Sequence, residues 1–285
     1  MIGEKKRVTT SVGEIAYVDR GAGPVALFVH GVFLNAHLWR HVIDRVAGVR
    51  RCLAVDLLSH GDSPSRPDQD ISFRGQAAML EVFCGALGLD QVDLVANDSG
   101  GAVAQIFAAR QPERIRTLTL TNCDVHDNYP PPAFSAARAA AAAGRFSARR
   151  AEFSANMGLF RPGFALAYED LDRVADETLR HYVGPLFSTP ERVRELERWL
   201  TSSGDCSQTV EIEPLLRQLR APTLIVWGTA DPFFPVAWAY WLRNSIPGSR
   251  PVIELQGAKL FFPEERPGAL ADALCEHWRC LNAAA

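Results

Sequence analysis

Residues 94–101, LVANDSGG, place a carboxylate, a hydroxyl and two glycines directly after an apolar run. A sharp strand-to-helix turn of this kind can carry the nucleophile of a hydrolase when the residues two before and two after the nucleophile are small. Around Asp98 these positions hold Ala96 and Gly100, whereas around Ser99 one of them is a bulkier Asn. The sequence therefore favours Asp98 as the nucleophile. Ser99 remains an alternative, and so does a glycine-rich turn in which Asp98 only caps the helix.

A carboxylate nucleophile implies a particular reaction. It attacks an sp³ carbon directly and forms an alkyl ester. A second group, most often a histidine, then acts as a general base and activates the water that hydrolyses this ester. Asp98 therefore needs backbone donors for the oxyanion, a histidine, and an acid that orients the histidine.

The backbone donors are predicted from a second motif. Residues 28–39, FVHGVFLNAHLW, follow an apolar run with a His-Gly turn. Here the chain resembles the α/β-hydrolase superfamily, in which this turn supplies one N–H of the oxyanion hole. The resemblance implies that Val32 and Ser99 are the two donors and that His30 is structural. The segment AVDLLSHGDSP resembles the next strand and loop of the family, which implies a structural role for His60 as well.

The acid is predicted from a third motif. Residues 224–235, LIVWGTADPFFP, resemble the acid loop of the family, and the residue at the acid position is Asp231. An Asp nucleophile is typical of the branch that holds haloalkane dehalogenases and epoxide hydrolases. Asn122 resembles a position that carries either an Asn or the acid in dehalogenases, so its identity fits an acid supplied by Asp231.

The catalytic histidine is missing from its expected place. The family carries it after the last strand, in a loop that corresponds here to residues 257–267, GAKLFFPEERP, and the aligned residue is Leu260. Further along the chain His277 occurs in the predicted terminal helix, where we expect a surface position. Without a general base, hydrolysis of the ester slows by roughly 10²–10⁴-fold. A buried Asp231 without an imidazole should find a cation, for which Lys259 is nearest in sequence.

Other departures concern the leaving group. Dehalogenases usually place a Trp directly after the nucleophile, and many place an Asn after the His-Gly turn, whereas this chain has Ser99 and Val32 there. Epoxide hydrolases use tyrosines to protonate the opening oxygen. The candidate accessory residues of the pocket are Asn122, His126, His181, Lys259, Leu260, Tyr129, Tyr168, Tyr182, Trp199, Phe160 and Phe187. For the lone histidines and aromatics a structural role is the more common one.

Short apolar runs alternate with helical patterns along the rest of the chain. We predict strands at 14–20, 25–31, 51–57, 91–97, 117–123, 222–228 and 251–257, and helices at 73–88 and 100–115. This alternation predicts an α/β fold with a mostly parallel sheet flanked by helices. Residues 126–216 lack a strand pattern and include helical stretches that end at Gly144 and Gly204. We predict a core of residues 1–125 and 217–285 and a helical cap, or lid, of residues 126–216.

Composition limits the classes of function. The 285 residues are 47% hydrophobic with a net charge of −3, so no basic excess favours nucleic acid or anionic membranes. The charged N-terminus and the lack of a long apolar run predict no signal peptide and no membrane span. The six scattered cysteines indicate free thiols of a cytoplasmic protein. No metal or cofactor motif occurs. The expected partner is a small apolar substrate, and the oligomeric state is not predicted.

Four hypotheses follow. The first is an Asp-nucleophile hydrolase that recruits another base, such as His126 or Lys259. The second is a non-hydrolytic isomerase, cyclase or lyase that uses Asp98 as a general acid or base. The third is a ligand-binding relic, and the fourth is a serine hydrolase that uses Ser99. The presence of Asp98 at a strained elbow, together with Asp231 and an intact oxyanion turn, favours an enzyme over a relic.

Overall fold

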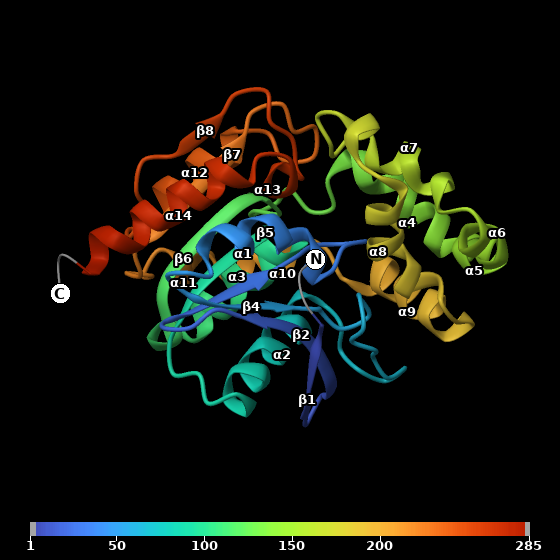
Figure 1. Ribbon diagram of the computed structural model, residues 1–285, viewed down its shortest axis with the longest axis horizontal. Helices are drawn as coiled ribbons and strands as arrows, with labels where there is room; N and C mark the ends of the chain where they lie inside the picture. Colours follow the sequence, from blue (N-terminus) through green and yellow to red (C-terminus); the bar gives the residue numbers. More distant parts are fainter. Residues whose placement is uncertain (1–3, 283–285) are drawn as a thin grey trace.

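A computed structural model describes residues 4–282, which form one eight-stranded sheet with helices on both faces (Figure 1). The strand order is β1-β2-β4-β3-β5-β6-β7-β8, and all pairs from β4 to β8 are parallel. The strands are β1 (Lys6–Thr10), β2 (Gly13–Arg20), β3 (Val25–Val29), β4 (Arg51–Val55), β5 (Val92–Asp98), β6 (Ile115–Cys123), β7 (Thr223–Gly228) and β8 (Ile253–Leu255). The predicted fold class, a mostly parallel sheet flanked by helices, is confirmed.

The central strands are buried on both faces, which explains their nearly continuous apolar sequences. The seven predicted strands are all present, with ends that differ by a few residues. The strand β1 was not predicted, because its sequence KRVTT is charged and it pairs only with β2 at the edge of the sheet. The ends of the predicted core, residues 1–3 and 283–285, lie outside the described residues.

The helices are α1 (Arg40–Val46), α2 (Phe73–Ala86), α3 (Ser99–Arg110), α4 (Ser135–Ala142), α5 (Arg145–Ala148), α6 (Arg150–Ala155), α7 (Arg161–Phe164), α8 (Asp176–Phe187), α9 (Pro190–Ser202), α10 (Ser207–Glu211), α11 (Glu213–Leu216), α12 (Ala237–Ser245), α13 (Phe262–Glu265) and α14 (Pro267–Asn282). Short 3₁₀ helices are η1 (Ala36–Trp39), η2 (Pro112–Arg114), η3 (Pro132–Phe134), η4 (Met157–Phe160) and η5 (Leu171–Arg173). Within residues 4–282, no helix is both long enough and apolar enough to cross a membrane.

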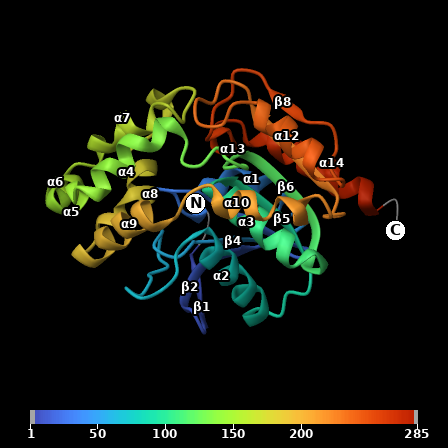
Figure 2. The same ribbon diagram turned by 180° about the vertical axis from the view of Figure 1, so that it is seen from behind.

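The order of the strands determines where a site can form. The chain leaves β3 through α1 toward β4, and then crosses back through α2 to β5 on the other side of β3. Right-handed crossovers therefore place α1 and α2 on opposite faces, where α1 packs on α14 and α2 packs on α3 (Figures 1 and 2). The carboxyl ends of β3 and β5 diverge at this switch point, which is where open α/β sheets bind ligands.

All elements between β6 and β7 are helical, from η3 to α11. We refer to residues 126–216 as the helical segment. Its elements from α4 to α9 lie to one side of the sheet in Figure 1, coloured from green to gold, whereas α10 and α11 pack on α3 of the core. That it works as a mobile lid stays a prediction.

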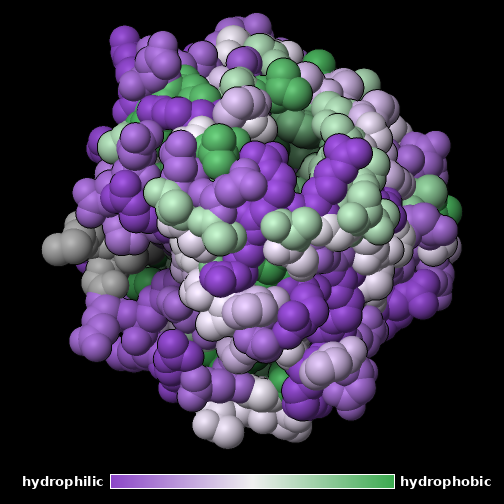
Figure 3. Space-filling view, turned by 90° about the vertical axis from the view of Figure 1, so that its right-hand side faces the viewer, coloured by the Kyte–Doolittle hydropathy of each residue, from purple (hydrophilic) through white to green (hydrophobic). Residues whose placement is uncertain are grey.

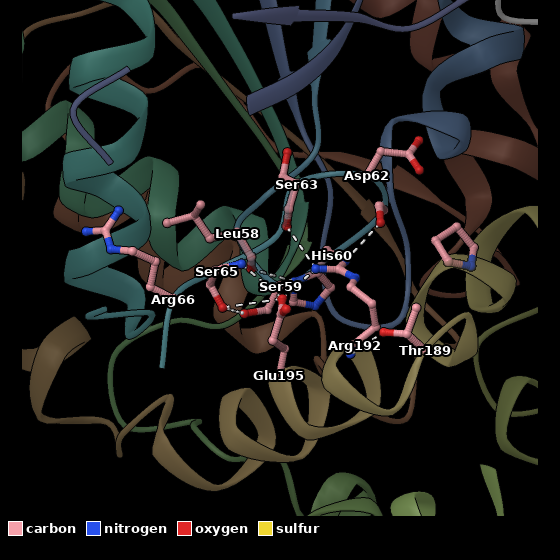
Figure 4. Close-up of polar contacts among 12 residues, drawn as sticks. Leu58, Ser59, His60, Asp62, Ser63, Ser65, Arg66, Thr189, Arg192 and Glu195 are labelled. Atoms are coloured by element: carbon pink, nitrogen blue, oxygen red, sulfur yellow. Dashed lines mark hydrogen bonds and ion pairs between the residues drawn. The ribbon is translucent and has the colours of Figure 1, made fainter. Parts of the chain in front are cut away.

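Helix α9 attaches the helical segment to the loop that carries His60 (Figure 4). Arg192 donates to the carbonyl of Gly61 at 2.9 Å, and the Ser65 N–H donates to Glu195 at 3.0 Å. Arg192 and Glu195 also pair with each other across one turn of the helix. These contacts hold α9 against the core and leave His60 beneath it.

Candidate active site

Asp98 is the last residue of β5, and α3 begins at the next residue. Its φ of 58° lies in the left-handed region, which costs energy for a residue other than glycine and is common at functional turns. A Cβ atom on Gly100 would lie 2.2 Å from the carbonyl oxygen of His30, so the turn requires a glycine there. The Asp98 side chain makes no capping hydrogen bond to α3. The geometry is that of an elbow, and the helix-cap interpretation is wrong.

The Asp98 carboxyl group is enclosed, with the residue only 5% exposed. Its Oδ2 has no hydrogen-bond partner among the described residues and lies so close to Gly31 that a Cβ atom there would be 2.2 Å away. Burial raises the pKa of Asp98 to about 7, and the charge of Asp231 adds to this, while the backbone N–H groups of Ser99 and Val32 favour the carboxylate. The two predicted oxyanion donors therefore act on the predicted nucleophile.

Asp231 follows β7 and is held by two donors. The Asn122 amide donates to its Oδ2 at 2.8 Å, and the Phe233 N–H donates to its Oδ1 at 2.8 Å. Burial raises the pKa of Asp231 to about 7, although these donors and the charge of Lys259 favour the ionised form. Asn122, at the end of β6, thus holds the carboxyl group of Asp231 in place.

Leu260, the residue that the sequence analysis aligns with the histidine of the family, is buried and forms part of the cavity wall. Its backbone carbonyl accepts a hydrogen bond from Asn97 at 3.1 Å, which fixes the loop beside the elbow. Lys259 is directed outward instead, and its Nζ lies 3.4 Å from the carbonyl oxygen of Ala165 in the helical segment. An aliphatic side chain therefore lies where a general base is expected.

A cavity of about 390 Å³ lies between the carboxyl ends of the strands and the helical segment. Its wall is strongly apolar and includes Phe33, Phe134, Phe146, Phe153, Phe160, Phe164, Phe233, Phe234 and Phe261. Leu159 and Leu166 also line it and are 40% and 47% exposed, so the cavity reaches the surface near α7. Figure 3 views the molecule from this side and shows hydrophobic residues gathered around a hollow in its upper part. The polar residues of the wall are few, which suits a small apolar ligand.

Some of the predicted accessory residues line the cavity, and others lie outside its wall. Tyr129 and Trp199 line the cavity, and the Tyr129 hydroxyl bonds Ser203. Tyr182 does not line it: its hydroxyl donates to Glu264 at 2.6 Å, where the helical segment meets the core. His126 does not line it either, because its ring stacks on Trp241 at 4.7 Å. We therefore do not retain His126 as a base.

The remaining histidines are also outside the cavity wall. His30 accepts the Leu57 N–H on Nε2 at 3.0 Å, and its Nδ1 lies 2.7 Å from the Gly31 carbonyl oxygen, so it is a neutral structural residue. His60 and His277 are likewise buried, and burial lowers the pKa of His60 to about 3 and that of His277 to about 4. The predicted surface position of His277 is wrong, because its side of α14 packs on the core.

Of the remaining predicted accessory residues, one lines the cavity and three lie outside its wall. His181 is half-exposed and stacks on His37 at 4.6 Å, and Tyr168 donates to Glu264 at 2.7 Å. Of the two further aromatics, Phe160 lines the cavity and Phe187 packs behind it at 4.9 Å. Residues 4–282 contain no group of three or more His, Cys, Asp or Glu side chains that could hold a metal ion.

Asp124 is a third buried carboxyl group that the sequence motifs did not indicate. It follows β6 directly, lines the cavity and is only 2% exposed. Its Oδ1 has no hydrogen-bond partner among the described residues. Burial raises the pKa of Asp124 well above its usual value, and the charges of Asp98 and Asp231 add to the effect.

Comparisons with known proteins agree with this architecture. A family model described as alpha/beta hydrolase fold matches residues 24–265. A haloalkane dehalogenase of Agrobacterium fabrum is 31% identical over 288 residues, covering 92% of this chain and 87% of that protein. A haloalkane dehalogenase of Mesorhizobium japonicum is 43% identical over 105 residues, covering 36% of this chain and 34% of that protein. The solved epoxide hydrolase CorEH superposes with a TM-score of 0.81 at 21% identity, covering 98% of this chain and 99% of that one, which supports the fold alone.

Proposed function

This chain belongs to the α/β-hydrolase fold family, and we propose that it acts as an enzyme on small apolar molecules through the carboxylate of Asp98. In this proposal the Asp98 carboxylate attacks an sp³ carbon that bears a halide or an epoxide oxygen, and an alkyl ester of Asp98 forms. Similarity to a haloalkane dehalogenase favours this chemistry over attack by Ser99.

The observation that carries the proposal is the environment of Asp98. A carboxylate is held at a strained elbow, beside two backbone donors, in the wall of an apolar cavity. Exclusion of water strengthens a carboxylate as a nucleophile because its hydration shell is removed. The N–H groups of Val32 and Ser99 are available for the oxyanion that forms when the ester is hydrolysed.

The second half of the reaction is impaired in this proposal. Leu260 lies at the histidine position, and the remaining histidines are outside the cavity wall. Hydrolysis of the ester therefore proceeds more slowly, by roughly 10²–10⁴-fold, than with an imidazole base. Asp231, held by Asn122 and Phe233, has the donors of a triad acid but no imidazole to orient.

The test is intact-protein mass spectrometry after incubation with primary bromoalkanes and terminal epoxides. We expect a covalent adduct on the wild-type protein and none on Asp98→Asn, and digestion should locate the adduct at Asp98. An adduct that survives in Asp98→Asn and disappears in Ser99→Ala would contradict the proposal. Released halide or diol without an adduct would keep Asp98 as nucleophile and show that a base other than the missing histidine works.

A second candidate function is non-hydrolytic acid/base catalysis by Asp98, for isomerisation, cyclisation or elimination. The observation that favours it is that burial raises the pKa of Asp98 to about 7, which suits proton transfer at neutral pH. Exchange of substrate hydrogen for deuterium, lost in Asp98→Asn and without any adduct, would identify this chemistry. Ligand binding without adduct, product or exchange would indicate a binding protein.

A further inference from the structure

Asp124 is a carboxyl group in the cavity wall that is neither the proposed nucleophile, Asp98, nor the acid of the loop after β7, Asp231. The Oδ1 atom of its carboxyl group has no hydrogen-bond partner among the described residues, and the residue is only 2% exposed. Buried polar groups are nearly always paired, so an unpaired one in a cavity wall indicates a partner supplied by the ligand.

The sheet places Asp124 beside the nucleophile. In the pairing of β5 with β6, Asp98 lies opposite Cys123, and Asp124 is the next residue. Both carboxyl groups line the cavity, whereas Asp231 does not and is already bonded to Asn122 and Phe233. A ligand in the cavity can therefore contact two carboxyl groups, that of Asp98 at the elbow and that of Asp124 after β6.

We propose that Asp124 is a second catalytic carboxyl group, which protonates the oxygen of an epoxide while Asp98 attacks its carbon. This inference rests on the proposed function and narrows its substrate class to epoxides. A lone pair of the Asp98 carboxylate forms the new carbon–oxygen bond, and the carbon–oxygen bond of the epoxide breaks. The released oxygen takes the proton of Asp124. The products are a hydroxyalkyl ester of Asp98 and the Asp124 carboxylate, which regains its proton from water.

The surroundings of Asp124 keep its proton in place until an acceptor arrives. The titratable groups that face it are Asp98 on β5, Asp231 after β7, Cys123 and Tyr129. None of these carries a positive charge, and burial raises the pKa of Asp124 well above its usual range, with the negative charges of Asp98 and Asp231 adding to it. Asp124 therefore holds its proton to a higher pH than an ordinary carboxyl group, while Asp98, with a pKa of about 7, supplies a carboxylate as the pH rises past neutrality, which is the pairing that acid-assisted displacement needs.

The cavity is less suited to a halide. A halide leaves without a proton but needs N–H donors around it, and two carboxyl groups in the same wall repel an anion whenever they are ionised. The N–H groups of Ser99 and Val32 already act on Asp98, so a halide would depend on the indole N–H of Trp199, which lines the cavity without a hydrogen-bond partner among the described residues. Tyr129, the tyrosine in the wall, has its hydroxyl bonded to Ser203, so Asp124 is the better proton donor for an oxygen.

The experiment compares two probes of equal chain length, hexyl bromide and the terminal epoxide of hexene, on wild type and Asp124→Asn. Alkylation of Asp98 is followed by intact-protein mass spectrometry. We expect Asp124→Asn to slow alkylation by the epoxide by roughly 10²–10⁴-fold and alkylation by the bromide by less than about threefold, because only the oxygen needs a proton. Tyr129→Phe is the matched control, and it should not separate the two probes.

The outcomes separate the two proposals. Equal slowing of both probes, or of neither, overturns the role of Asp124 and leaves Asp98 as the nucleophile. Labelling of the wild-type protein by the bromide but not by the epoxide does the same. Labelling of the wild type by neither probe overturns the proposed function and this inference with it. An independent readout is the infrared difference spectrum between wild type and Asp124→Asn at neutral pH. It should contain the carbonyl band of a protonated carboxyl group, and a carboxylate band in its place overturns the proposal.

Discussion

At the scale of single residues, the site contains three buried carboxyl groups and no buried cation among the residues that line its cavity. In a triad, an imidazole between Asp98 and Asp231 would share its protons with both. In the proposed alignment Leu260 takes the place of this group, and burial raises the pKa of Asp98 and that of Asp231 to about 7. In the proposed function, the replacement that slows hydrolysis of the ester thus also affects the protonation of Asp98 and Asp231.

Restoring the imidazole should restore hydrolysis. We expect Leu260→His to accelerate loss of the Asp98 ester by roughly 10²–10⁴-fold, because the new base lies where the family carries it. The decay of the adduct by mass spectrometry measures this rate. The gain should disappear in the double variant Leu260→His/Asp231→Asn, in which the imidazole has no acid. An unchanged decay rate in Leu260→His would refute the alignment of Leu260 with the histidine.

Alkylation of Asp98 should require a glycine at position 31. A Cβ atom there would lie 2.2 Å from Oδ2 of Asp98, so Gly31→Ala must displace the carboxylate. We expect alkylation of Asp98 to fall by at least about 10²-fold, the usual effect of a misplaced reacting group. Gly85→Ala is the control, since nothing lies within 4 Å of its added atom, and this helical position should gain up to about 1 kcal/mol of stability. Undiminished alkylation in Gly31→Ala would contradict this account.

The raised pKa of Asp98 predicts how stability depends on pH. The pKa of Asp98 is about 3.9 in the unfolded chain and about 7 in the folded protein, so the folded state keeps the proton up to a higher pH. The contribution of Asp98 to the stability of the folded state is fully present below the unfolded pKa, and it is lost as the pH rises through the folded pKa. Asp98→Asn should therefore raise the melting temperature more near pH 8 than near pH 5. Asp68→Asn, at a side chain that is 83% exposed, should show no such difference; an equal effect in both variants would contradict the burial of Asp98.

Much of the site could be predicted from the sequence because its parts have local signatures. The elbow around Asp98, the turn before Val32 and the loop of Asp231 each combine small residues and strand ends within a few positions. Asp124 has no such signature, since what distinguishes it is the absence of a partner in three dimensions. The position of His126 depends on its stacking with Trp241, more than a hundred residues away, which no local pattern indicates.

At the scale of elements, a buried polar cluster joins the helical segment to the core. Glu264 in α13 accepts from Tyr168 at 2.7 Å and from Tyr182 of α8 at 2.6 Å, and it pairs with Arg40 of α1. Both charged side chains are nearly buried, so each depends on the other. Sequence patterns gave the strands and the longer helices, but this cluster arises from docking of elements and could not be predicted.

Glu264→Gln should loosen this junction. It leaves the Arg40 charge buried without its partner, which typically costs roughly 3–5 kcal/mol. We expect faster hydrogen exchange of backbone amides in α8 and a lower melting temperature, both measurable on the purified protein. The control is Glu197→Gln, whose carboxylate bonds Ser147 within the helical segment and does not reach the core. Equal effects of the two variants would mean that the cluster does not fasten the segment.

At the scale of the whole molecule, polar contacts attach the helical segment to the core at several places, two of which lie in different parts of the fold. One is the Glu264 cluster, and the other is the contact of α9 with the loop that carries His60. Attachment on both sides means that the segment cannot open without breaking buried polar contacts. The cavity nevertheless reaches the surface beside α7, at Leu159 and Leu166. A small ligand can therefore enter while both attachments stay closed.

This arrangement predicts that core and helical segment unfold as one cooperative unit. Hydrogen exchange at increasing denaturant should give amides of α9 and of β5 that converge on one free energy of opening, because separating the segment would also expose the apolar cavity wall. Amides of α7 should exchange at lower free energy, since local movement there suffices for entry. If α9 instead exchanges well below β5, the segment opens as a whole. Entry would then depend on the Glu264 cluster, and Glu264→Gln would speed alkylation of Asp98 rather than leave it unchanged.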